Sequence, residues 1–232
     1  MLAGFTLING ATQTSGNSTT NQSGGGVWCE SSSAIVSNCV LKGNSAGWGG
    51  GAFSGTLNNC TLTANSAFGD GGGSSSGTLK NCTLTSNSAT GQYGTGGGAS
   101  SGTLNNCTLT GNSASQSGGG AFYGTLNNCI IYYNRAPDGA NYYNSTLNYC
   151  CTTPLPSTGT TNLTVEPELA SAWRLSASSP CRGAGGAAYA TGTDLDGEPW
   201  AQPPSIGCDE YRSGSLTGAL SAAIVASYYE RR

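Results

Sequence analysis

The chain has 232 residues and a formal net charge of −3, and only 8% of its residues are charged, against about 25% in an ordinary soluble domain. It contains 38 Gly and 10 Cys but no His, which excludes histidine-dependent nucleophiles and histidine-ligated metals. The basic residues are scattered, with only Arg231 and Arg232 adjacent, and no apolar run approaches the length of a membrane span. We therefore predict neither nucleic-acid binding nor a membrane span.

Residues 1–23 are predicted to form a partial coil at the N-terminal edge of a repeat. Phe5-Thr6-Leu7 resembles the Cys-Thr-Leu segment of the units that follow, but the first half of that unit is missing. An open coil of this kind exposes unpaired backbone groups. Unless residues 8–23 fold over this edge, we expect chains to associate end to end through it, as a homo-oligomer.

Residues 24–152 hold a repeat of 21 to 25 residues, which runs from Gly-Gly-Gly through Gly-Thr-Leu-Asn-Asn-Cys-Thr-Leu-Thr to Asn-Ser-Ala. Cys60 and Leu62 can share one face of a strand, whereas Leu57 and Cys60 cannot, so a corner lies between them at Asn59. An Asn repeated at this corner can bond to the Asn one rung away. The pattern predicts three short strands per coil and a parallel β-solenoid of about six coils. The equivalent cysteines are Cys39, Cys60, Cys82, Cys107, Cys129 and Cys150.

Residues 153–212 lack the repeat and are predicted to form a C-terminal closing module. Residues 213–232 are expected to begin a further, truncated domain or a tail, with one helix over 218–229, so we expect a fragment of a longer secreted protein. Asp194, Asp196 and Glu198 have the spacing of a calcium loop in miniature, but the segment is far shorter than an EF-hand. We interpret it as a turn, and we predict no metal site and no cofactor.

The repeat resembles that of right-handed parallel β-helix proteins, and its Leu-x-x-Asn-Ser-Ala and Gly-Gly-Gly-Ala-Phe phrases are similar to the repeats of chlamydial polymorphic membrane proteins. Glu166-Pro167-Glu168-Leu169 and Ile206-Gly207-Cys208-Asp209-Glu210-Tyr211 resemble the closing module of secreted bacterial β-helix proteins that carry surface anchors. The resemblance implies an all-β, right-handed parallel β-helix outside a bacterial cell or at its surface. This superfamily includes lyases, glycosidases and adhesins, so the resemblance does not fix a function.

The six repeating cysteines are expected to form an inward column of free thiols. Neighbours about 4.8 Å apart with parallel Cβ vectors do not suit a disulfide, and no Cys-x-x-Cys pair points to a metal. Outside the column, we expect a disulfide between Cys181 and Cys208, whereas Cys151 and Cys29 have no assigned partner.

Aromatic side chains recur on the loop that closes each coil. Trp48, Phe68 and Tyr93 are expected to stand above one another along one edge, with Asp70 and Gln92 beside them. Rings next to polar groups suit the faces of sugars. The alternative is that the rings fold down over exposed glycines. We favour an extracellular module or adhesin that presents this edge to carbohydrate.

The main alternative is a polysaccharide-active enzyme, either a glycoside hydrolase or a lyase. Asp70 and Asp138 are expected three coils apart, or about 14 Å, which exceeds the separation of a glycosidase pair. Tyr132, in the aromatic-rich sixth coil, is a candidate to bind a sugar, although the aromatic residues there can equally seal the junction with the closing module. The candidate catalytic residues are Asp70, Asp138, Arg135 and Tyr143, with Glu30 and Asp209 as more distant carboxylates.

A second alternative is an ice-binding face. Three coils carry Thr-x-Thr on the outer face of the same predicted strand, and the array ends at Lys42 and Tyr132. Threonine is also a common residue of exposed strands, so the pattern alone does not indicate ice binding. The array comprises Thr61, Thr63, Thr83, Thr85, Thr108 and Thr110.

Overall fold

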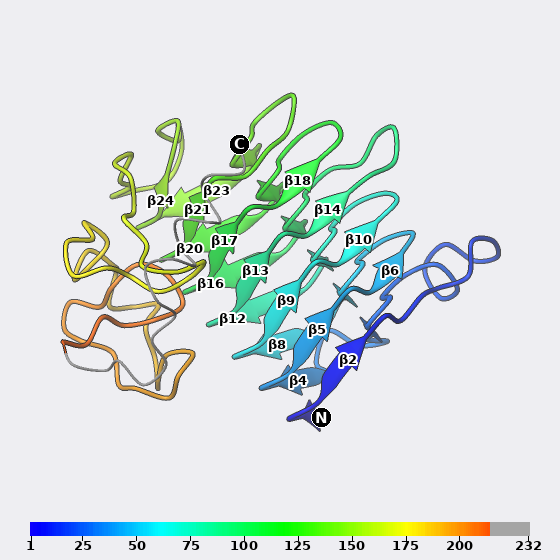
Figure 1. The fold of residues 1–232 in the computed structure, drawn as a ribbon, viewed down its shortest axis with the longest axis horizontal. Helices are drawn as coiled ribbons and strands as arrows, with labels where there is room; N and C mark the ends of the chain where they lie inside the picture. Colours follow the sequence, from blue (N-terminus) through cyan, green and yellow to red (C-terminus); the bar gives the residue numbers. More distant parts are fainter. Residues whose placement is uncertain (214–232) are drawn as a thin grey trace.

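The structure, a computed structural model, describes residues 1–213, and the regular secondary structure among them consists of β-strands only. The predicted helix over 218–229 lies outside the described residues. The strands form four parallel sheets that run along a coiled rod (Figure 1). Each strand pairs with its equivalents in the neighbouring coils, so the predicted parallel β-solenoid of about six coils is confirmed.

Two of the four sheets have seven strands each and flank the corner that the sequence predicts. The first contains β1 (Leu2–Ala3), β4 (Ile35–Ser37), β8 (Thr56–Asn58), β12 (Thr78–Lys80), β16 (Thr103–Asn105), β20 (Thr125–Asn127) and β23 (Thr146–Asn148). The second contains β2 (Thr6–Ile8), β5 (Val40–Lys42), β9 (Thr61–Thr63), β13 (Thr83–Thr85), β17 (Thr108–Thr110), β21 (Ile130–Tyr132) and β24 (Cys151–Thr152).

The other two sheets are built from strands of two residues. One contains β3 (Val27–Trp28), β7 (Ala52–Phe53), β11 (Ser74–Ser75), β15 (Ala99–Ser100), β19 (Ala121–Phe122) and β22 (Tyr142–Tyr143). The other contains β6 (Ser45–Ala46), β10 (Ser66–Ala67), β14 (Ser88–Ala89) and β18 (Ser113–Ala114). The first four complete coils therefore have four strands, not the predicted three, because the Ser-Ala that follows each closing Asn pairs with the same dipeptide one coil away.

The corner between the two long sheets has a left-handed backbone in every coil. Asn tolerates this conformation better than most residues because its short polar side chain can bond locally. The corner residues are Asn38, Asn59, Asn81, Asn106 and Asn128, with φ between 49° and 52°, and Tyr149 with φ 53°. The repeated Asn of the sequence is therefore explained by the backbone that the corner needs.

The core contains columns of leucine and cysteine, and its largest side chains are fully buried. The ten cysteines are all free thiols, as predicted for the column. The predicted Cys181–Cys208 disulfide was wrong. The Cys208 amide donates to Thr108 Oγ1 at 3.2 Å, whereas Cys181 packs in a separate apolar cluster with Cys151 and Ile206. Residues 153–213 pack on the solenoid in a way that gives Cys181 and Cys208 different neighbours.

Each coil closes on a buried Asn that bonds to the coils on both sides. The Nδ2 group of Asn65 donates to Asn87 Oδ1 at 2.9 Å and to the Leu41 carbonyl at 2.9 Å, and the Asn65 amide donates to the same Asn87 oxygen at 3.0 Å. This closing ladder consists of Asn44, Asn65, Asn87, Asn112 and Asn134. Its members are at most 6% exposed, so buried amides are satisfied within the core.

The C-terminal segment, residues 153–213, first covers the last coil and then returns along the side of the solenoid. Over the last coil, the Leu163 amide donates to the Cys150 carbonyl at 2.8 Å. Alongside the corner, Asn81 Nδ2 donates to the Thr193 carbonyl at 2.7 Å and Asn106 Nδ2 to the Tyr189 carbonyl at 2.9 Å. The same side chains bond to each other from coil to coil, and this corner ladder consists of Asn59, Asn81, Asn106 and Asn128.

Candidate functional site

The loop edge that follows β6 and β10 carries aromatic rings that lie against the following coil. Trp48 lies against the next coil: a Cβ placed on Gly69 would be 2.6 Å from Trp48 Nε1. A Cβ on Gly91 would be 3.0 Å from Phe68 Cδ1. Both rings therefore lean over a glycine of the following coil, and the absence of a side chain there makes room for them. Even so, Phe68 remains 72% exposed.

The longer fourth loop extends this edge. Tyr93 is 68% exposed and Gln92 is also exposed. Asp70 lies nearby in the preceding coil and accepts a hydrogen bond from Thr95 Oγ1 at 2.6 Å. Because the threonine belongs to the same loop as Tyr93, this bond joins the two loops. The edge therefore offers exposed rings and uncharged polar groups, with one carboxylate that has a partner.

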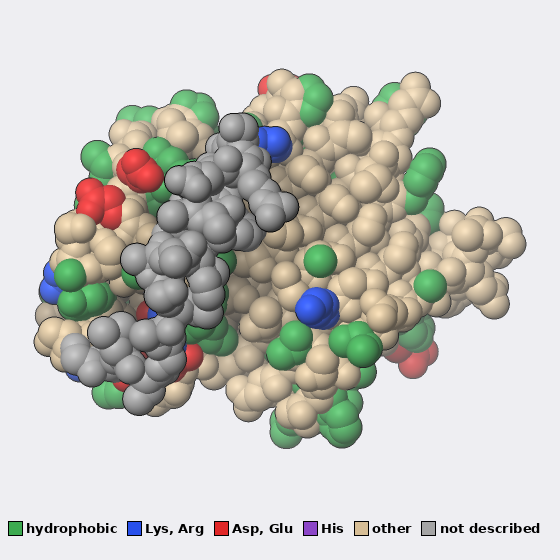
Figure 2. Space-filling view, viewed as in Figure 1, with side chains coloured by type: hydrophobic (Ala, Val, Ile, Leu, Met, Phe, Trp, Pro, Cys, Tyr) green, Lys and Arg blue, Asp and Glu red, His purple; other side chains and the backbone are tan. Residues whose placement is uncertain are grey.

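On the face shown in Figure 2, backbone and side chains that are neither hydrophobic nor charged make up most of the surface over the coils. The acids on this surface are far apart. Asp70, Thr95, Ser117 and Asp138 occupy equivalent places in four successive coils, because Thr95 pairs with Ser117, Ser117 pairs with Asp138, and the Gly71 amide donates to the Thr95 carbonyl. Three coil spacings separate the two aspartates, or about 14 Å. A pair of carboxylates at glycosidase distance is therefore not formed by Asp70 and Asp138.

The remaining candidates for catalysis do not meet either. Arg135 and Asp138 are both exposed and form no ion pair; the ion pairs of residues 1–213 join Arg174 to Asp196 and Arg212 to Glu198. Glu30 is exposed on the loop after β3. The candidate acids and Arg135 are therefore not arranged around a shared cleft.

Two aromatic residues of the last two coils are held by their neighbours. The Tyr143 ring stacks on Phe122 of the preceding coil, with centroids 5.6 Å apart. Tyr132 packs against the apolar cluster that joins β21 to the C-terminal segment, and burial together with Cys151 and Glu166 raises its pKa. Tyr132 thus seals the junction, while Tyr143 lies on the outer face of the short sheet.

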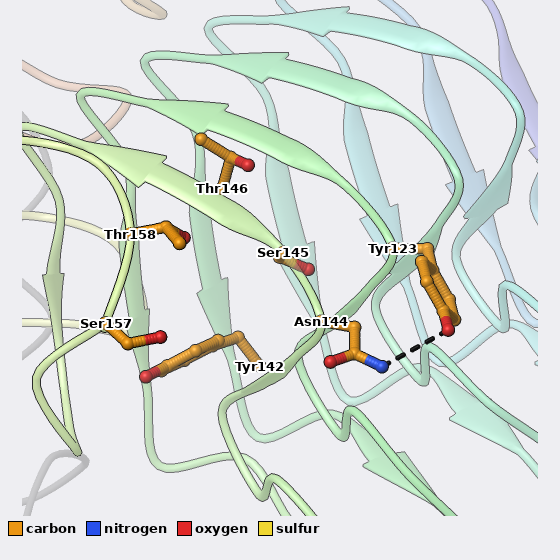
Figure 3. Close-up of a pocket in the computed structure, with 7 residues that line it drawn as sticks. All are labelled: Tyr123, Tyr142, Asn144, Ser145, Thr146, Ser157 and Thr158. Atoms are coloured by element: carbon orange, nitrogen blue, oxygen red, sulfur yellow. Dashed lines mark hydrogen bonds between the residues drawn. The ribbon is translucent and has the colours of Figure 1, made fainter.

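A pocket that the sequence did not indicate lies at the C-terminal end of the solenoid (Figure 3). Its volume is about 510 Å³. It is lined by Tyr123, Tyr142, Asn144, Ser145, Thr146, Ser157 and Thr158. The one sequence signal for it is Tyr123, which stands where the three preceding coils carry Ser54, Ser76 and Ser101.

The segment with calcium-loop spacing forms a turn around a buried carboxylate. Asp194 Oδ1 accepts hydrogen bonds from the amides of Asp196 and Glu198, at 3.0 and 2.8 Å, and Asp194 Oδ2 accepts one from the Glu210 amide at 2.9 Å. The carboxylates of Asp196 and Glu198 face arginines instead. Among residues 1–213, no three potential ligand side chains come together to hold a metal ion.

Asp209 is the one carboxyl with a strongly shifted titration in the described part of the chain. Its side chain is only 4% exposed, and burial raises its pKa to about 7 despite the opposing field of Arg174. Its Oδ1 atom is buried without a hydrogen-bond partner among residues 1–213. The charged groups that act on it all belong to the C-terminal segment, so it does not pair with the candidate carboxylates of the coils.

The threonine array is largely covered. Thr83 and Thr108 are 1% and 0% exposed, and Thr110 is 7% exposed. The C-terminal segment makes the contacts: the Cys208 amide donates to Thr108, and Thr110 Oγ1 donates to the Ala172 carbonyl at 2.8 Å. The flat, exposed threonine face that ice binding requires is therefore interrupted in two of the three coils.

Comparisons with protein-family models, with curated protein sequences and with solved structures found no match to this chain. Within residues 1–213 there is no helix of the length and hydrophobicity needed to cross a membrane.

Proposed function

We propose that this chain is a non-catalytic module that works outside a bacterial cell or at its surface and binds carbohydrate along the loop edge of its solenoid. The observation that carries the proposal is the pair of rings on successive loops, Phe68 and Tyr93, which remain 72% and 68% exposed. Rings that are costly to leave in water and stand beside polar groups are typical of surfaces that bind the faces of sugars.

Support also comes from the rigidity of the edge. Every coil is fixed to the next by paired strands, and the Thr95–Asp70 hydrogen bond ties the fourth loop to the third. A rigid edge loses little conformational entropy when it binds, which favours adhesion by a repetitive surface. The rival interpretation, an enzyme that acts on polysaccharides, gains no support, because its candidate acids stand alone.

The experiment is a binding screen of the purified chain on immobilised bacterial, plant and animal glycans. Phe68→Ser and Tyr93→Ser are expected to weaken binding roughly tenfold each, because each removes an exposed ring from the edge. Phe5→Ser is the matched control, since Phe5 is an exposed ring, at 54%, that lies outside the edge. Equal affinities for all four proteins would refute the assignment of the edge.

A further inference from the structure

We propose that the pocket at the C-terminal end of the solenoid is a second carbohydrate site, selective for an uncharged sugar. This inference deepens the function proposed above and rests on it. The pocket is concave, unlike the loop edge, and its volume of about 510 Å³ lies within the range of about 300–1,000 Å³ typical of small-molecule sites. It can therefore enclose a sugar residue instead of only supporting it.

The lining of the pocket defines the class of ligand. Two phenols, one carboxamide and four hydroxyl-bearing side chains surround the space, and none of the lining residues is charged. Hydroxyls and amides both donate and accept hydrogen bonds, which matches the hydroxyl groups of a sugar. An acidic sugar would bring a carboxylate into a site without a cation to pair it, at a desolvation cost. The lining thus favours neutral sugars.

The walls of the pocket are fixed by the fold. Tyr142 packs against the core of the solenoid and donates its hydroxyl to the Pro154 carbonyl at 3.3 Å. Ser157 and Thr158 come from the C-terminal segment on the same side as Tyr142, and Asn144 and Tyr123 form the other side (Figure 3). Asn144 Nδ2 donates to Tyr123 Oη at 3.2 Å, which holds the two side chains together.

Tyr123 is the corner tyrosine that the hydrogen bonds and ring contacts to the C-terminal segment do not explain. Its backbone has φ 49°, a left-handed conformation that is unfavourable for a bulky residue, and the equivalent places in three earlier coils hold Ser. Tyr133 and Tyr149 also replace small or Asn residues at left-handed corners, but they contact the C-terminal segment: Tyr133 donates to Glu166, and Tyr149 lies beside Tyr189.

Tyr123, by contrast, contacts its own coil and the next one. Its ring meets Phe122 edge-on at 4.6 Å, its hydroxyl accepts the hydrogen bond from Asn144, and its side chain is 58% exposed at the pocket. A large ring in an unfavourable backbone conformation, left open to solvent beside a polar pocket, is expected where the ring has a ligand to contact.

The test is titration calorimetry of the full chain with cellotriose, mannotriose and chitotriose as uncharged probes and trigalacturonic acid as the acidic one. Tyr123→Ser restores the residue of the earlier coils, so it is expected to fold and to bind the preferred neutral probe at least about tenfold more weakly. Asn144→Asp adds a charge at constant size and is expected to weaken neutral binding as well. Phe5→Ser is the control, since Phe5 is an exposed ring that lies outside both the loop edge and the pocket.

The outcomes separate this inference from the proposed function. Loss of neutral binding in Tyr123→Ser but not in Phe5→Ser supports the pocket. Binding that survives Tyr123→Ser and is lost in Phe68→Ser overturns the pocket and leaves the loop edge in place. Tighter binding of trigalacturonic acid than of any neutral probe overturns the selectivity. No binding of any saccharide, here and in the glycan screen, overturns both proposals.

Discussion

Two asparagine ladders run along this solenoid, and they stabilise different parts of the molecule. The closing ladder lies inside, where each amide bonds to a leucine carbonyl and to the next Asn, so it holds one coil to another. The corner ladder turns its amides outward, where they donate to backbone carbonyls of residues 186–194 as well as to each other. The same residue at the same spacing therefore stabilises the core in one place and holds a neighbouring segment in the other.

The largest effect is expected inside, from Asn87→Ala. This change removes the donors to Leu62 and Asn112 and leaves the amide and the Nδ2 group of Asn65 without their acceptor. Unsatisfied buried groups cost about 1–3 kcal/mol each, so the free energy of unfolding should fall by about 3–4 kcal/mol. Urea unfolding measures it, with Ser88→Ala as a control in the adjoining strand; a loss equal to that of the control would contradict the ladder's role.

The second effect is a pH dependence of stability that is expected from the C-terminal segment but not from the closing ladder. The closing ladder contains no titratable group, whereas the C-terminal segment buries Asp209, with Arg174, Asp194, Asp196 and Glu198 around it. Burial raises the pKa of Asp209 from 3.8 to about 7, so its folded form retains a proton that the unfolded form releases. The contribution of Asp209 to stability is therefore fully present below pH 3.8 and is lost as the pH rises through about 7.

Between about pH 5.5 and pH 7.5, this group should lower the free energy of unfolding by on the order of 2 kcal/mol. Urea titrations at several pH values measure the slope, and Asp209→Asn should remove most of it. A wild-type slope that persists unchanged in Asp209→Asn would assign the effect to another group.

The third effect is local to the corner ladder. Asn106→Gly keeps the left-handed backbone available but removes the hydrogen bonds to Tyr189 and Asn81. We expect the free energy of unfolding to fall by about 1–2 kcal/mol, and the effect to be local to the contact between the corner ladder and residues 186–194. Hydrogen exchange by mass spectrometry should show faster exchange at residues 186–194 and little change within the coils. Faster exchange throughout the solenoid would show that the two ladders are not separate.

The smallest effect is expected from reducing agents. All ten cysteines are free, and burial raises the pKa of the column thiols Cys82, Cys107 and Cys129 well above its ordinary value, so they stay protonated and unreactive in the folded chain. Reductant should leave the unfolding midpoint unchanged, and thiol titration in denaturant should find ten groups. A count of eight would reveal a disulfide.

The repeat made the fold predictable, because Cys60, Leu62 and Asn59 recur at spacings that only stacked coils accommodate. It could not predict contacts between segments without a repeat. The predicted Cys181–Cys208 disulfide was wrong for this reason. The prediction that Thr108 is exposed was also wrong, because the segment that covers it is distant in sequence.

In the candidate site, too, the repeat predicted some features, and contacts from segments without a repeat could not be predicted. The three-coil separation of Asp70 and Asp138 follows from the repeat, and the register of the structure agrees with it. The pocket does not follow, because Ser157 and Thr158 reach it from the C-terminal segment. The sequence did mark Tyr123, because a bulky residue stands there at a corner that holds Ser in the three preceding coils. A single departure from a repeat, however, does not reveal which residues lie opposite it.

The most direct test of the central claim, binding without catalysis, is to measure retention on an insoluble polysaccharide and release of new reducing ends in the same sample. The account predicts saturable binding with no release beyond a protein-free control, and identical behaviour for Asp70→Asn and Asp138→Asn. Steady release of reducing ends by the wild type, abolished by either substitution, would contradict it and identify this chain as an enzyme.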